Sequence, residues 1–119
     1  MGFRIASQLG LQPHVPCKVD DDSLQEKSKV GSLEVMHLPG HTSGNLALWL
    51  RDGAVIAAAD TIMTWPSFSA GWPGFNRDET QFARSLERVV ALKPDVVCTG
   101  HGDPLCGPGT ADSIATLVG

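Results

Sequence analysis

Four segments of the chain carry the alternating or continuous apolar pattern that is typical of β-strands. They are residues 32–38 (SLEVMHL), 45–51 (NLALWLR), 54–60 (AVIAAAD) and 95–100 (DVVCTG). In the second, three leucines share one face while Ala47 and Trp49 lie on the other, so both faces are expected to be covered. The third is almost entirely apolar, which predicts a central, buried strand. The Arg-Asp-Gly segment at 51–53 predicts a tight hairpin between these two strands.

Three other segments carry a helical pattern. Residues 77–93 place Phe82, Leu86, Val89 and Val90 on one stripe, which predicts a helix that packs on a sheet and ends before Pro94. Asn76, with Glu79 three residues on, is the expected cap of this helix. A closing helix is expected over 110–119 with Thr110 as its cap. A short helix is expected over 3–9, ending at Gly10.

The remaining segments are expected to be extended or looped. Residues 13–19 contain two prolines and predict extended chain, and the polar residues 20–29 predict an exposed loop. The loop at 61–75 holds Trp65 and Trp72, which either cover the core or line an interface or substrate site. The order of elements predicts one domain over 1–119 of the α/β (α+β) class, a sheet with helices on at least one face.

Composition narrows the function classes. The 119 residues carry a net charge of −4 and no Lys/Arg cluster, so neither nucleic acid nor an anionic membrane is an expected partner. The longest apolar run, 54–59, is far too short to span a bilayer, and the first residues do not resemble a signal peptide. Three cysteines without a Cys-x-x-Cys pair indicate free thiols and a cytoplasmic location.

Polar side chains follow three of the predicted strands. His41 follows the first strand, Asp60 ends the third and His101 follows the fourth, so we expect them to meet at one edge of the sheet. Imidazole and carboxylate are ligands of zinc and similar divalent metals. Thr42 and Ser43 are placed to orient such ligands by hydrogen bonds. The competing interpretation gives all three residues ordinary roles in turns.

The segments HLPGHTSGN, AAAD and GHGDP together resemble, in order and spacing, the C-terminal half of the metallo-β-lactamase superfamily. The resemblance covers roughly residues 30–105 and includes the helix before the last segment. It implies half of a four-layer αββα sandwich, with one mixed sheet and helices on one face. It also implies that His41 binds a first metal, that Asp60 bridges two metals and takes part in catalysis, and that His101 binds the second.

The chain also departs from the family pattern. The His-x-His-x-Asp-His motif is absent, because no two of the four histidines lie two residues apart, and Ala59 stands where a glycine is expected before the aspartate. The chain therefore has the pattern of a truncated family member. Each ion would receive two protein ligands, whereas catalytic zinc has three. A single chain is expected to bind zinc, iron or manganese weakly or not at all.

Three functions remain open at this point. The chain is a metal-dependent hydrolase, a non-catalytic remnant that binds a partner, or a half-enzyme completed by a complementary chain. Half of the sandwich, without the second sheet, leaves an apolar sheet face around Leu46, Leu48 and Val55 exposed to solvent. This exposed face predicts a homodimer that packs sheet on sheet.

The other polar candidates have ordinary explanations. His37 is expected to be structural and His14 to face solvent. Cys98 is expected to be a buried apolar residue, and Cys106 lies close enough in sequence to His101 for a zinc role to be considered.

Overall fold

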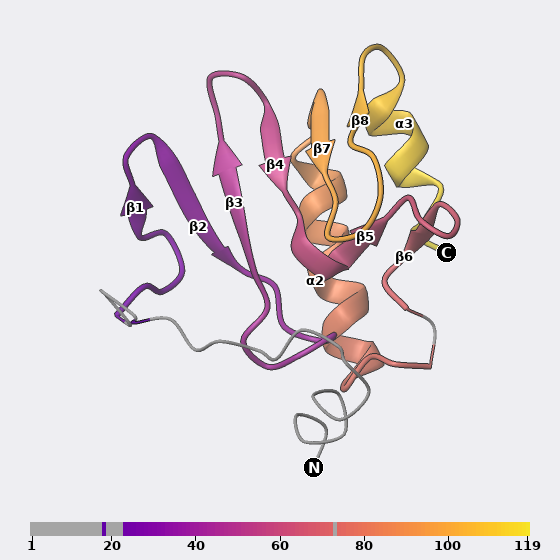
Figure 1. Cartoon of the computed structure of the whole chain (residues 1–119), viewed down its shortest axis with the longest axis horizontal. Helices are drawn as coiled ribbons and strands as arrows, with labels where there is room; N and C mark the ends of the chain where they lie inside the picture. Colours follow the sequence, from indigo (N-terminus) through magenta and orange to yellow (C-terminus); the bar gives the residue numbers. More distant parts are fainter. Residues whose placement is uncertain (1–17, 19–22, 73) are drawn as a thin grey trace, which may run out of the picture.

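A computed structural model describes residues 18, 23–72 and 74–119, and its main feature is a six-stranded sheet (Figure 1). The sheet has the order β1-β2-β3-β4-β7-β8, in which only β4 and β7 are parallel. Its strands are β1 (Lys29–Val30), β2 (Leu33–His37), β3 (Leu46–Leu50), β4 (Val55–Ala57), β7 (Val96–Cys98) and β8 (Leu105–Cys106). Two helices, α2 (Glu79–Ala91) and α3 (Thr110–Ala115), complete the mixed sheet-and-helix architecture that the sequence predicts.

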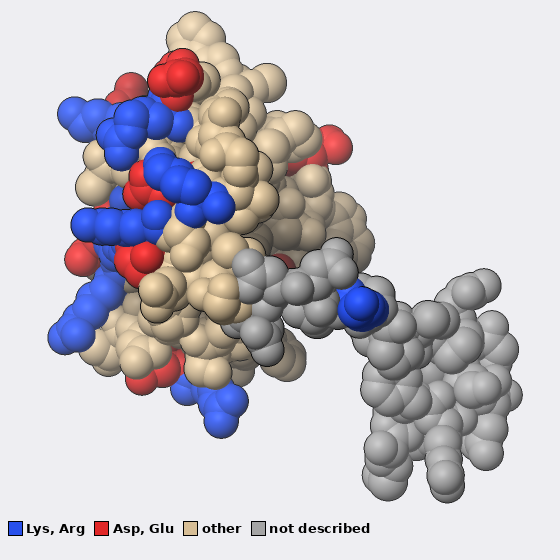
Figure 2. Space-filling view, turned by 90° about the vertical axis from the view of Figure 1, so that its left-hand side faces the viewer, with Lys and Arg blue, Asp and Glu red and all other residues tan. Residues whose placement is uncertain are grey.

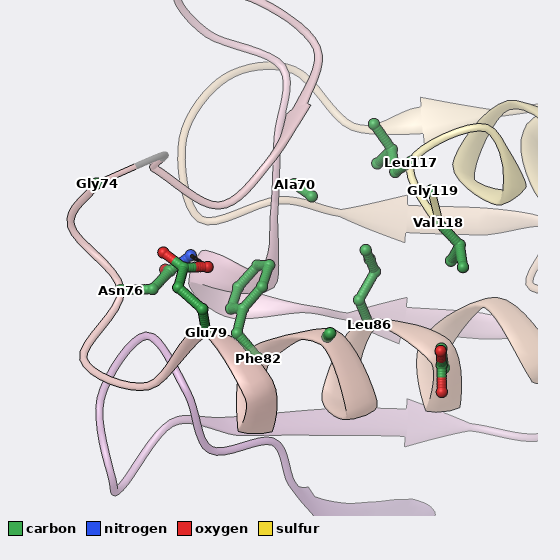
Figure 3. A pocket seen from close by; sticks show the side chains of 11 residues that line it. Ala70, Gly74, Asn76, Glu79, Phe82, Leu86, Leu117, Val118 and Gly119 are labelled. Atoms are coloured by element: carbon green, nitrogen blue, oxygen red, sulfur yellow. Dashed lines mark hydrogen bonds between the residues drawn. The ribbon is translucent and has the colours of Figure 1, made fainter.

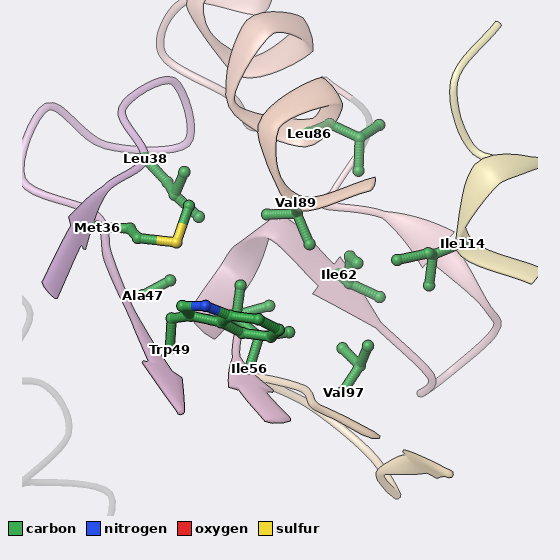
Figure 4. Close-up of a cluster of buried hydrophobic side chains, with 11 residues drawn as sticks. Met36, Leu38, Ala47, Trp49, Ile56, Ile62, Leu86, Val89, Val97 and Ile114 are labelled. Atoms are coloured by element: carbon green, nitrogen blue, oxygen red, sulfur yellow. The ribbon is translucent and has the colours of Figure 1, made fainter. Parts of the chain in front are cut away.

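The core lies between the sheet and the helices. Trp49 pairs with Ile56 and Ile56 with Val97, so these side chains share one face of adjoining strands, and each is at most 5% exposed. Further buried members of this cluster come from β2, β3 and the later strand at Ile62–Met63, from both helices, and from the loops that follow β2 and β4 (Figure 4). They are Met36, Leu38, Ala47, Ala58, Ile62, Leu86, Val89 and Ile114. The helices therefore pack on the Trp49 face of the sheet.

The α2 helix confirms the predicted stripe but not the predicted cap. Phe82, Leu86 and Val89 are buried, and Val90 packs beside them. The cap is Asp78, whose carboxylate accepts a hydrogen bond of 3.0 Å from the Gln81 N–H. Asn76 lies two residues outside the cap position, so its side chain is available for other contacts.

The start of α3 differs from the prediction, and the predicted N-terminal segments lie outside the described residues. Thr110 is the first helical residue and not the cap, because Gly109 takes the cap position with a φ of 90°. The Thr110 hydroxyl donates instead to the Gly107 carbonyl. The expected helix at 3–9 lies outside the described residues, as does 13–19 except for Lys18.

Several strand boundaries differ from the predicted ones. The third predicted strand stops at Ala57, and a 3-10 turn, η1 (Ala59–Thr61), follows it. β1 and β8, each of two residues, were not predicted, since so short a segment carries no periodic signal. The long loop contains a small hairpin of its own, β5 (Ile62–Met63) with β6 (Ser69–Ala70).

The face of the sheet opposite the helices is apolar and partly open. Leu46 is 37% exposed there, and Leu48 and Val55 are half-buried. Cys98 pairs with Ala57 on this face and is exposed, so the prediction of a buried Cys98 is wrong. No described helix packs on this side, which is the arrangement that the sequence analysis expects for a docking face.

Charged side chains of both signs alternate on the side of the molecule that Figure 2 shows. Lys29 and Arg51 both lie within 4 Å of Glu34. Glu26 pairs with Arg88 of α2 and also accepts a hydrogen bond from the backbone N–H of His37. Burial raises the pKa of Glu26, but these two hydrogen bonds, together with the neighbouring positive charge of Arg88, outweigh burial and hold that pKa below its ordinary value. Among the described helices, none has the length and apolar content to cross a bilayer.

Candidate metal centre

His41, Asp60 and His101 meet at one edge of the structure, as the sequence predicts. The two oxygens of the Asp60 carboxylate face different imidazoles. Oδ2 lies 3.5 Å from Nε2 of His41, and Oδ1 lies 3.2 Å from Nε2 of His101. The His41 side chain is 19% exposed and that of His101 is 46% exposed, so the cluster is open to solvent on the His101 side.

The loop that carries His41 is fixed to the first turns of α2. Gly40 has a φ of 137°, and a Cβ atom there would lie 2.4 Å from the Cα of Phe82. The Gly40 carbonyl accepts from the Asp78 N–H at 2.9 Å, and Ser85 donates to the Pro39 carbonyl at 2.7 Å. The Pro-Gly pair therefore lets the backbone approach the helix, and this contact sets the position of the next residue, His41.

Asp60 is held by η1 and not by the end of a strand. The chain turns out of β4 at Ala59, whose φ of 48° lies in the left-handed region. For a residue with a Cβ atom this conformation costs about 1 kcal/mol, so the glycine expected here from the family pattern has a physical reason. The Gly100 N–H donates to the Ala59 carbonyl at 2.8 Å, and a Cβ at Gly100 would lie 2.5 Å from Asp60 Oδ1.

His101 is positioned by bonds to its own carbonyl oxygen. That oxygen accepts from the backbone N–H groups of Thr64 and Trp65 at 2.9 and 3.3 Å. Gly102 allows this approach, because a Cβ there would lie 2.3 Å from the Thr64 hydroxyl. The imidazole also meets the Trp72 ring edge-on, with centroids 5.7 Å apart.

Asn76 is a site residue that the sequence analysis did not identify as one. Its Oδ1 lies 3.2 Å from Nδ1 of His41, and its Nδ2 donates to Glu79 Oε2 at 3.2 Å. The Asn76 and Glu79 side chains lie together beside Phe82 at the start of α2 (Figure 3). Since a carboxylate only accepts, the amide N–H group must face Glu79 and the amide oxygen must face His41. Thr42 and Ser43, expected in this role, have exposed side chains.

The orientation of Asn76 fixes the tautomer of His41. Nδ1 must carry a hydrogen to donate to the amide oxygen, so a neutral imidazole presents the lone pair of Nε2 to the Asp60 carboxylate. Two electron-rich groups 3.5 Å apart repel unless a proton or a cation lies between them. The geometry therefore favours a positive charge at this position.

The separations between the donor atoms suit a bound metal ion, but the number of donor atoms is too small for one. Two donors bound at about 2.0–2.1 Å to a tetrahedral ion lie about 3.3 Å from each other. The two Asp60–histidine separations, 3.5 and 3.2 Å, bracket that value. Each position between Asp60 and a histidine nevertheless has only two donors. Over residues 23–72 and 74–119, no group of three or more His, Cys, Asp or Glu side chains is arranged to hold one ion.

Two of the hollows in the described part of the chain are lined by residues of the segment 70–76. One, of about 330 Å³, is lined by His41, Trp72 and Phe75. The other, of about 320 Å³, lies between the start of α2, β6 and residues 117–119, and the three clustered residues do not line it (Figure 3). Only the first is continuous with the candidate centre.

Two other polar candidates that the structure describes, His37 and Cys106, do not belong to this cluster. Nε2 of His37 lies 2.7 Å from the Ser43 carbonyl, so His37 has the structural role expected of it. Cys106 is exposed on β8, and no group of metal ligands in the described part of the chain includes it. His14 lies outside the described residues.

Comparison with known proteins agrees with this fold. Residues 14–101 match the sequence profile of the metallo-beta-lactamase superfamily, and the chain belongs to that superfamily. Its members typically bind zinc or iron. The chain is 29% identical over 92 residues to the probable metallo-hydrolase YflN of Bacillus subtilis. The matched region is 67% of this chain and 35% of YflN.

Solved structures of the superfamily share the architecture. The structure of the BLEG-1 B3 metallo-beta-lactamase matches 99% of the chain with 25% identity and a TM-score of 0.70, and the chain covers 58% of it. TTHA1623, solved in a di-iron-bound form, matches 87% of the chain with 25% identity and a TM-score of 0.62, and the chain covers 52% of it. The chain thus spans about a third of the length of YflN and about half of these two structures.

Proposed function

We propose that this chain supplies part of the ligand set of a hydrolytic metal centre, and that the 119 residues do not catalyse hydrolysis without further ligands. In the proposal, Asp60 bridges two divalent cations, zinc, iron or manganese, while His41 and His101 each bind one of them. The observation that carries it is the contact of 3.2 Å between Asn76 Oδ1 and His41 Nδ1. Asn76 makes Nε2 an acceptor, and this acceptor faces a carboxylate at the separation of two ligands of one ion.

The roles of the side chains follow from their surroundings. A divalent cation held here would polarise a substrate carbonyl and make water more acidic. Asp60, whose side chain is 34% exposed, would contribute one carboxylate oxygen to each cation, because its two oxygens face different histidines. Asn76 keeps the Nε2 lone pair of His41 directed at the centre. With two donors for each position, the affinity of one chain for metal is expected to be low.

The missing donors are proposed to come from a second polypeptide, and a second copy of this chain is the simplest source. The open apolar face around Leu46, Leu48 and Val55 supports this idea. A homodimer with aligned edges would bring together four histidines and two aspartates.

Metal analysis of the protein tests the proposal. Protein purified without chelator is separated by size, and zinc, iron and manganese are measured across the elution profile. We expect metal in the assembled species and little in the monomer. His41→Ala and His101→Ala should each remove it, whereas the control Asp103→Asn should not, because Asp103 forms no ion pair with the described residues of the cluster.

The alternative function, a non-catalytic binding domain, predicts a different result. It requires no metal in any species and a melting temperature that EDTA does not change. That outcome would reject the metal centre and leave the loops around His41 and His101 with a structural role alone.

A further inference from the structure

The hollow between α2, β6 and residues 117–119 is a groove with an apolar floor, and we call it the α2 groove. Phe82 and Leu86 of α2 point into it towards Ala70 and Leu117 (Figure 3). Its volume of about 320 Å³ lies at the lower end of the range of small-molecule pockets, about 300–1,000 Å³. None of the three candidate metal ligands lines it, so a ligand in this groove is separate from the candidate centre.

The walls of the α2 groove are held by backbone hydrogen bonds and by close packing. The Gly71 N–H, next to β6, donates to the Thr61 carbonyl at 3.0 Å. A Cβ atom at Gly71 would lie 2.7 Å from the Phe82 ring, so the β6 side packs directly on α2. The Leu117 N–H donates to the Ile114 carbonyl at 3.0 Å. A ligand would therefore meet walls that are already arranged and would lose little free energy in ordering them.

The charged side chains that line the α2 groove are all acidic. They are Glu79 and Glu87, and no Lys or Arg lines it. The two glutamates are eight residues apart on α2, which places them about 12 Å apart along the helix. Oε2 of Glu79 accepts from Asn76, and a carboxylate can accept at both oxygens, so Oε1 is open to a further donor. Glu87 takes part in none of the ion pairs between described residues.

We propose that the α2 groove binds a linear diammonium ion, in which two ammonium groups are joined by an apolar chain of about eight carbons. The chain lies on the floor formed by Phe82 and Leu86, and one ammonium group meets each glutamate. Two nitrogens joined by nine bonds lie about 11 Å apart when the chain is extended, which matches the spacing of the carboxylates.

The charges of the groove oppose the other occupants. A neutral or anionic ligand would leave both glutamates without a positive partner. A second copy of this chain would meet the groove with the same surface in a two-fold contact, and this would bring the glutamates of both copies together. Like charges repel in such a contact, so a small cation suits the groove better.

The test compares 1,8-diaminooctane with 1-aminooctane, which has the same chain and one ammonium group fewer. Each is titrated at low salt into protein with ¹³C-labelled methyl groups, and the signals of Ala83, Leu117 and Val118 are followed by NMR. We expect saturable shifts with both amines and about threefold tighter binding of the diamine, the effect of one exposed ion pair. 1,4-Diaminobutane, whose nitrogens are about 6 Å apart, should bind more weakly than either, because it spans half the distance and buries less apolar surface.

Two substitutions locate the second ammonium group. Glu87→Gln removes one carboxylate from the groove and should abolish the difference between the two amines. The matched control is Asp52→Asn, which removes the same charge from the exposed turn between β3 and β4 and should preserve the difference. Both side chains are exposed, so the fold should tolerate either change.

Four results would overturn the proposal. Equal affinity of the two amines for the wild-type protein would show that the second ammonium group has no partner. A difference that survives Glu87→Gln would place that partner elsewhere. Equal losses in the two variants would assign binding to the net charge of −4 and not to the groove. Methyl signals that shift with protein concentration alone, without a response to either amine, would show that another protein copy occupies the groove.

Discussion

Asn76 shows how one amide can determine the chemistry of a neighbouring histidine. It is oriented by Glu79, and it in turn makes His41 donate from Nδ1. A metal-binding imidazole is commonly held in this way by a hydrogen bond from its other nitrogen. The sequence suggested that Asn76 caps α2, and the physical reason for the difference is that Asp78 lies closer to the free N–H groups of the first turn.

The tautomer gives a prediction that does not depend on activity. In Asn76→Ala, His41 loses its acceptor at Nδ1, so its hydrogen should redistribute to Nε2, where Asp60 accepts it. Long-range ¹H–¹⁵N correlation spectra of the histidine rings measure this directly. Metal affinity should fall by about 10- to 100-fold.

Two controls make this experiment specific. Glu79→Gln keeps a carbonyl acceptor for the Asn76 N–H and should leave the wild-type tautomer unchanged. The ring signals of His37, which contacts Ser43 instead, should be the same in all three proteins. A His41 tautomer that is unchanged in Asn76→Ala would contradict the role of Asn76.

At the scale of elements, the sequence predicted long periodic segments well and local turns poorly. The stripe of α2 and the strand β3 were evident because their burial follows a regular period. The end of β4 was not, because Ala59 enters a left-handed turn that its residue type disfavours. The convergence of His41, Asp60 and His101 was predictable from their order along the chain, but Asn76 required knowledge of the side-chain contacts.

The contact between the His41 loop and α2 gives a prediction at this scale. Gly40→Ala should destabilise the fold by about 3 kcal/mol, since the added Cβ meets the Phe82 backbone and the φ of 137° disfavours alanine. Urea denaturation followed by circular dichroism measures the loss. The matched control is Gly44→Ala in the same loop, where no atom lies within 4 Å of the added group. Equal stability of the two variants would show that the loop does not pack on α2 as described.

At the scale of the whole molecule, the sheet has helices on one face and an open apolar surface on the other. Burial of the Leu46 face against a second copy should give a dimer that light scattering detects at micromolar concentration. Leu46→Glu should shift the population towards monomer, because a charge would be buried at the contact. Val118→Glu places the same charge at a residue of similar exposure on the α2 side and should leave the dimer intact. A wild-type protein that is monomeric at this concentration would contradict the proposal.

The carbonyl oxygen of His101 joins two segments that are far apart in the sequence. Because the amides of Thr64 and Trp65 donate to it, the segment after β5 cannot shift without moving the backbone of a proposed ligand. Metal binding at the centre should then slow the exchange of those two amide hydrogens with deuterated water. Two backbone positions that never touch an ion would in this way report on whether one is bound.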